Sequence, residues 1–100
     1  MSAELTNEMR ADTQMMISIA EAYYKDLSAF NTNMENKLQD VERNLGEIKR
    51  NWNDGNFDNF NKIVKDKISK LKEQIGRSRD LEAIIKDTIK EYKEALAYME

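Results

Sequence analysis

Residues 45–60 have the sequence LGEIKRNWNDGNFDNF, and they contain the one clear break in a chain whose pattern is otherwise helical. On both sides of this stretch, apolar residues recur every three or four positions, the spacing that places them on one stripe of an α-helix. Within the break, at residues 53–56, Gly55 is predicted to take a left-handed conformation and to end the first helix. Asn56 is predicted to cap the second helix, whose first turn holds Asp58. We therefore predict helices over about residues 5–52 and 57–98, joined by a turn at 53–56.

The apolar stripe runs through almost the whole chain. In the first half it comprises Met9, Met16, Ala20, Tyr23, Leu27, Phe30, Met34, Leu38, Val41, Leu45, Ile48 and Trp52. In the second half it comprises Phe57, Phe60, Val64, Ile68, Leu71, Ile75, Ile85, Ile89, Tyr92, Leu96 and Met99. Two successive steps of four follow Phe30 and Phe60, and such steps locally unwind a left-handed supercoil. A polar gap at residues 76–80 lies nearly opposite residues 31–33, and we expect the weakest packing there.

These features predict an all-α fold, a single domain over residues 1–100 built as an antiparallel helix-turn-helix hairpin. Because only four residues join two helices of similar length, the second helix must run back along the first. This geometry places Ile17 opposite Tyr92 and Tyr24 opposite Ile85.

The composition excludes several classes of protein. The 100 residues include no proline, no cysteine, no histidine and three glycines, and 35% of them are charged. An all-β fold needs many turns, which draw on glycine and proline. Without cysteine there is no disulfide framework or thiol site, and without histidine the commonest general base and metal ligand are missing. We therefore expect no catalytic residues, no cofactor and no metal site.

Other ligands and partners are also disfavoured. The Asn- and Asp-rich turn suggests calcium, but aligning Gly55 with the glycine of an EF-hand loop places Arg50 and Trp52 at ligand positions. A net charge of −3 gives no reason to expect nucleic acid. Apolar stretches such as Met15–Ile17 are too short to span a membrane or to form the core of a signal peptide. The lysines of residues 62–72 leave membrane-surface binding as a weaker hypothesis, but acidic residues interleave with them, and membrane contact is not expected.

The part of the hairpin farthest from the turn carries more apolar surface than two helices need. Ile17 and Tyr98, for example, lie beside the stripe. Such a surplus usually marks an interface, and a second hairpin would cover it in a four-helix bundle. Long charged side chains covering the surplus are the alternative. The candidate dimer interface comprises Met15, Met16, Ile19, Tyr23, Tyr24, Leu81, Ile84, Ile85 and Tyr92.

Three aromatic residues flank the turn. Trp52 ends the first helix on its apolar stripe, and Phe57 and Phe60 open the second helix on theirs. We expect these rings to pack together and close the tip of the hairpin. If the Trp52 ring is fully buried, its replacement by alanine would cost about 3–5 kcal/mol.

The central tryptophan, the turn and the two long helices resemble the WXG-type family, the small early-secretory-antigen-like substrates of bacterial type VII secretion. Members of this family have similar length, no cysteine and an aromatic residue eight positions after the tryptophan, as Phe60 follows Trp52. The resemblance implies a non-enzymatic protein that acts through helix faces, as a homodimer or as a heterodimer with a similar hairpin. It also implies contact of the turn motif, Trp52, Asp54, Gly55, Phe57 and Phe60, with the secretion machinery.

The sequence departs from the family pattern in two places. The turn is Trp-Asn-Asp-Gly instead of Trp-x-Gly, because Asp54 follows Trp52 by two positions and Gly55 comes one later. The family's export signal, a tyrosine followed four residues later by Asp or Glu, is absent, and a partner chain would have to supply it. The resemblance implies secretion without a cleaved signal peptide. The alternative is a cytoplasmic coiled-coil adaptor or scaffold that is not exported.

Overall fold

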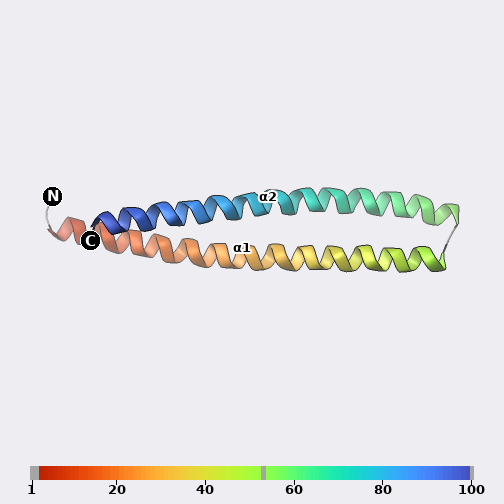
Figure 1. Cartoon of the computed structure of the whole chain (residues 1–100), viewed down its shortest axis with the longest axis horizontal. Helices are drawn as coiled ribbons and strands as arrows, with labels where there is room; N and C mark the ends of the chain where they lie inside the picture. Colours follow the sequence, from red (N-terminus) through yellow and green to blue (C-terminus); the bar gives the residue numbers. More distant parts are fainter. Residues whose placement is uncertain (1–2, 53, 100) are drawn as a thin grey trace. The chain divides into compact units, whose positions relative to one another are not determined.

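The computed structural model describes residues 3–52 and 54–99, which form two helices (Figure 1). Helix α1 spans Ala3–Asn51 and helix α2 spans Gly55–Met99, and the described residues include no strand. The prediction of an all-α helical hairpin is therefore confirmed. Helix α2 begins two residues earlier than predicted, so that Gly55 and Asn56 belong to it. Asn53, in the predicted turn, lies outside the described residues.

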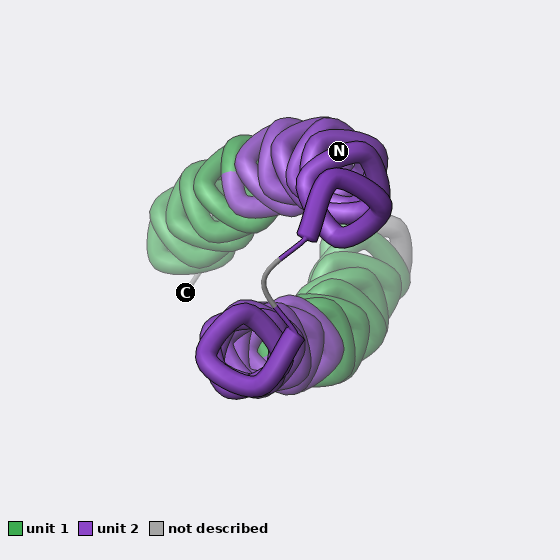
Figure 2. Tube along the Cα trace, turned by 90° about the vertical axis from the view of Figure 1, so that its right-hand side faces the viewer, with its two compact units in different colours: residues 1–28, 80–100 green, residues 29–79 purple. Residues whose placement is uncertain are grey.

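The chain groups into two compact units (Figure 2). Unit 1 comprises residues 1–28 and 80–100, and unit 2 comprises residues 29–79. Each unit contains a segment of both helices, which run antiparallel, and both α1 and α2 continue from one unit into the other. The boundary falls beside the polar gap at residues 76–80, where the sequence predicts the weakest packing.

The buried and half-buried apolar residues of both helices follow a seven-residue repeat, with positions a and d toward the other helix as in a coiled coil. Four d positions, Val41, Ile48, Leu71 and Tyr92, are 36–43% exposed. On α1 the a positions are Arg10, Ile17, Tyr24, Asn31, Leu38 and Leu45, and the d positions are Thr13, Ala20, Leu27, Met34, Val41 and Ile48. On α2 the a positions are Asn61, Ile68, Ile75, Glu82, Ile89 and Leu96, and the d positions are Phe57, Val64, Leu71, Ser78, Ile85, Tyr92 and Met99. We call these rows the seam.

The predicted steps of four at Phe30 and Phe60 are wrong, because the seam passes through the next residue in each case. The Phe30 side chain is 60% exposed, whereas the next residue, Asn31, is 1% exposed. Asn61 is half-buried and takes the position expected for Phe60. The prediction followed apolar residue types, but the seam at these two positions is filled by asparagine. The repeat has no insertion here, and it gives no reason for local unwinding.

A one-residue shift also separates the predicted stripe from the seam near the N-terminus. Met9, Met16 and Tyr23 were expected in the stripe, but all three are exposed. The seam instead contains the residue after each of them: Arg10, Ile17 and Tyr24.

The predicted register holds in unit 1. Arg10 precedes Ile17 by one heptad, and Met99 follows Tyr92 by one heptad. The Arg10 guanidinium Nη2 donates a hydrogen bond of 2.6 Å to the backbone carbonyl of Met99, which joins the two helices at this pair.

Ion pairs close one side of the hairpin in each unit. Ion pairs that cross between the helices include Glu21–Lys93 (3.5 Å) in unit 1 and Glu35–Arg79 (2.9 Å) and Glu42–Lys72 (2.7 Å) in unit 2. Every member of these pairs occupies heptad position e, next to the seam. We call this side the e side. Positions g and c of both helices lie on the opposite side, which we call the g side.

Candidate functional site

The hairpin tip is organised by the carboxylate of Asp54. Its Oδ1 accepts a hydrogen bond of 3.0 Å from the backbone N–H of Phe57, three residues on, which is the geometry of a helix N-cap. Its Oδ2 accepts a hydrogen bond of 2.8 Å from the indole Nε1–H of Trp52. The backbone N–H of Trp52 donates to the Ile48 carbonyl at 2.7 Å, so the helical bonding of α1 extends to the tryptophan. One carboxylate therefore connects the end of α1 to the start of α2.

These bonds stabilise the charged form of Asp54. The backbone N–H of Phe57, followed by the Trp52 indole, holds the pKa of the Asp54 carboxyl below its ordinary value of 3.8. The cap is therefore in its acceptor form at neutral pH.

Two predictions about the turn are wrong. Asp54 caps α2, whereas Asn56 lies inside its first turn. None of the described glycines has a positive φ, so Gly55 is not in the left-handed conformation. It occupies the first helical position after the cap. The signal for the correct cap was present in the sequence, because aspartate is among the residues preferred at the N-cap.

The three predicted aromatic residues form a cluster at the tip. Ring centroids are 5.8 Å apart for Trp52 and Phe57, and 6.4 Å apart both for Trp52 and Phe60 and for Phe57 and Phe60. Phe57 is fully buried and is the centre of the cluster, whereas Trp52 is 43% exposed. The outer surface of the tip is therefore partly aromatic.

The g side of unit 1 presents a group of exposed, large apolar side chains, which we call the apolar face. Its members on α1 are Met9, Met16, Ile19 and Tyr23, and its members on α2 are Leu81, Ile84 and Tyr98. All of them occupy heptad positions g or c, which are neighbours on the helix surface. Within unit 1 they are contributed by both helices, and Tyr98 is 94% exposed.

The candidate dimer interface divides between the apolar face and the seam. Met16, Ile19, Tyr23, Leu81 and Ile84 belong to the apolar face, and Met15 is exposed at position f beside it. Tyr24 and Ile85 are half-buried at seam positions, where they contribute to pairing within the hairpin. Tyr92 also occupies a seam position, but it is 36% exposed, so part of its ring remains available to another molecule together with the first group. Sequence reasoning missed Met9 as a member of the face, although its spacing of seven from Met16 was the signal.

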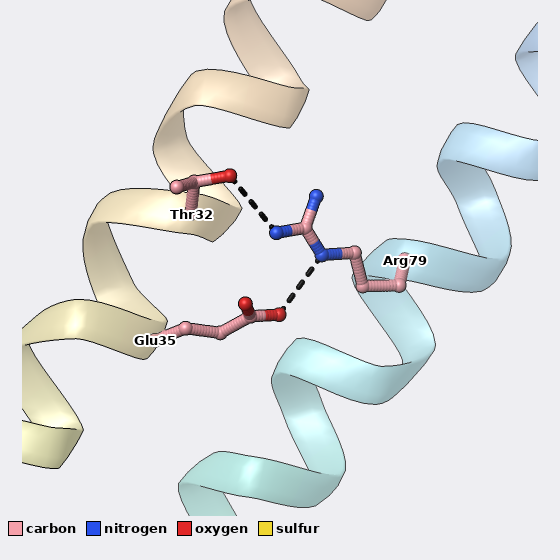
Figure 3. Close-up of polar contacts among 3 residues, drawn as sticks. All are labelled: Thr32, Glu35 and Arg79. Atoms are coloured by element: carbon pink, nitrogen blue, oxygen red, sulfur yellow. Dashed lines mark hydrogen bonds and ion pairs between the residues drawn. The ribbon is translucent and has the colours of Figure 1, made fainter.

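The e side of unit 2 has a different character. The Arg79 Nε donates to Glu35 Oε1 at 2.9 Å and its Nη2 donates to Thr32 Oγ1 at 3.0 Å, so one guanidinium holds two residues of α1 (Figure 3). Two open grooves of about 400 and 500 Å³ run along this side and share Glu42 and Lys72 in their lining. Charged side chains border both grooves.

No group of three carboxylates among the described residues is placed to hold a metal ion. Neither helix, over its described length, has a stretch apolar enough to cross a bilayer.

Comparisons with known proteins give no match to this chain, whether with family models, with curated proteins or with solved structures. The candidate site therefore rests on the geometry described above.

Proposed function

We propose that this protein is a non-enzymatic helical hairpin that acts by binding another protein through the apolar face of unit 1. The observation that carries the proposal is the difference between the two sides of unit 1. On the e side, Glu21 and Lys93 form an ion pair across the helices. On the g side, seven large apolar side chains are exposed. A soluble chain rarely keeps so much contiguous apolar surface in water, and such surfaces usually bind partners.

We further propose a role like that of type VII secretion substrates or their partner subunits, on the resemblance of the turn and the two helices to that family. The aromatic tip supports this role, because the part-exposed rings of Trp52 and Phe60 are available to a partner at the end of the hairpin. A cytoplasmic adaptor or scaffold that uses the same face is the second candidate. The two candidates differ in where the protein is found.

The secretion role is tested by location. The chain is expected in the culture supernatant of its native host, and it should be retained in cells that lack the secretion ATPase. Retention in the cytosol of cells with an intact secretion system would favour the adaptor.

Binding through the apolar face is tested in native cell extract by gel filtration. The wild-type chain is expected to elute well ahead of its monomer position, and the variant Met16→Ser/Tyr23→Ser/Ile84→Ser is expected to elute as a monomer. The matched control Gln14→Ala/Lys25→Ala/Lys90→Ala changes three exposed residues away from the face and should elute like the wild type. Elution of the wild type as a monomer would contradict the proposal.

A further inference from the structure

The charges of the two units differ in sign. Unit 1 contains eleven acidic and five basic residues, a formal net charge of −6, and unit 2 contains eight acidic and eleven basic residues, a formal net charge of +3. Together they give the net charge of −3 of the whole chain. The apolar face therefore belongs to the strongly acidic unit.

The acidic residues of unit 1 are not spread evenly around the helices. The exposed carboxylates at positions c and f, on or beside the apolar face, are Glu8, Asp12, Asp26, Asp80, Asp87, Glu91 and Glu94. We call these residues the acidic rim. The basic residues of unit 1 occupy only positions a, b and e, on the seam or on the e side: Arg10, Lys25, Lys86, Lys90 and Lys93. Within unit 1 the apolar face is thus bordered by carboxylates, and no basic residue occupies position c, f or g.

We propose that the apolar face is built for a partner helix or hairpin whose own apolar face is bordered by lysine and arginine, and not for the same acidic face of a second copy of this chain. The inference rests on the proposed function and specifies its partner. Packing two copies face to face would bring two acidic rims together, and juxtaposed like charges oppose association. A basic rim would instead attract the acidic one, and it would increase the rate of encounter at low salt.

The chain itself can be turned into such a partner. The variant Asp12→Lys/Asp26→Lys/Glu91→Lys keeps the apolar face and reverses three charges on its rim. Wild type and variant, one of them isotope-labelled, are mixed in equal amounts and analysed by native mass spectrometry and sedimentation velocity. We expect a mixed complex at least about tenfold tighter than the self-association of either chain, and weaker as salt is raised. Circular dichroism checks that both chains are equally helical.

The matched control distinguishes an effect of the acidic rim from an effect of the net charge of the whole chain. Asp40→Lys/Glu47→Lys/Glu73→Lys makes the same change in formal charge on unit 2, and it should not form the mixed complex. A mixed complex with this control would overturn the inference. Self-association of the wild type as tight as the mixed complex would also overturn it and would make a second copy the partner, but the proposed function would stand. Absence of association in every mixture would contradict the inference, whereas the proposed function would still be decided by gel filtration in native extract.

Discussion

At the scale of single residues, the carboxylate of Asp54 connects the end of α1 to the start of α2. Its two carboxylate oxygens bind the Trp52 indole and the Phe57 backbone. Asp54 therefore links the two helices at the tip. The link depends on the ionised carboxylate. In that form both oxygens are hydrogen-bond acceptors, whereas protonation converts one of them into a donor.

The stability of the tip should depend on the protonation of Asp54. Because folding lowers the pKa of this carboxyl, its contribution is fully present above the ordinary value of 3.8 and is lost as the pH falls through the lower, folded-state pKa. Urea unfolding of the wild type and of Asp54→Asn, measured from pH 7 to about pH 2, isolates this contribution as the difference between the two curves. The difference should shrink at acidic pH. A difference independent of pH would show that the charge of Asp54 is not used.

The rings of the tip should differ in their effect on stability. Phe57 is fully buried, so Phe57→Ala is expected to lower the unfolding free energy by about 3–5 kcal/mol. Trp52 is 43% exposed, so the condition for a cost of that size is not met, and Trp52→Ala is expected to cost only about 1–2 kcal/mol. Chemical denaturation of both variants provides the test. An equal or larger loss for Trp52→Ala would contradict this order.

At the scale of the helices, the glycines are not explained by packing within the chain. A Cβ built on Gly46, Gly55 or Gly76 meets no atom within 4 Å. Gly46 and Gly76 lie inside α1 and α2, where glycine is less favourable than alanine by about 1 kcal/mol. Gly55 has no positive φ and needs no special backbone freedom.

Alanine at these positions should therefore be tolerated or favourable. Gly46→Ala and Gly76→Ala are each expected to raise the unfolding free energy by about 0.5–1 kcal/mol. Gly55→Ala is expected to leave it unchanged or slightly raised, whereas a left-handed residue at this position would make the same change destabilising. Denaturant midpoints measure all three effects. Destabilisation by Gly55→Ala would contradict this expectation and would support the left-handed conformation that the sequence predicts for Gly55.

The two helices show why the sequence predicts the fold more accurately than it predicts which residues form the seam. The break at residues 53–56 and the long apolar stripe are sufficient to predict two antiparallel helices, because helix period and turn signals are local properties. The seam depends on which residues the other helix covers. Asn31 is buried and Phe30 is exposed, a choice that residue hydrophobicity alone assigns the wrong way. A buried asparagine at position a commonly fixes register at some cost in stability.

The candidate site was predictable to a similar degree. The aromatic tip and six of the seven members of the apolar face follow from residue type and spacing. The separation of Tyr24 and Ile85 from the face did not follow, because it depends on the side to which a helix turns after a shift of one residue. A shift of one position turns a helical side chain by about 100°, enough to move it from the seam to the surface. The cap role of Asp54 was missed for another reason, since Asp54 and Asn56 are both residue types preferred at an N-cap.

At the scale of the whole molecule, the division into an acidic unit and a basic unit has a consequence that does not involve a partner. Net charge of one sign destabilises a compact structure through self-repulsion, and salt screens this repulsion. Unit 1, with a formal charge of −6, has more self-repulsion to lose than unit 2, with +3. One ion pair of unit 1, Glu21–Lys93, is half exposed and contributes little stability that would offset this repulsion.

Salt should therefore reduce amide hydrogen exchange by different amounts in the two units. Raising the salt concentration from low ionic strength to about 0.5 M is expected to slow amide hydrogen exchange more in residues 6–28 and 80–99 than in residues 29–79. The variant Asp12→Lys/Asp26→Lys/Glu91→Lys brings the formal charge of unit 1 to zero, because each substitution raises the charge by two. In this variant, salt should no longer slow hydrogen exchange more in unit 1 than in unit 2. Exchange followed by peptide mass spectrometry measures both chains. A salt response that is equal in the two units, or one that persists in the variant, would show that helix propensity and packing govern local stability and that the acidic rim does not.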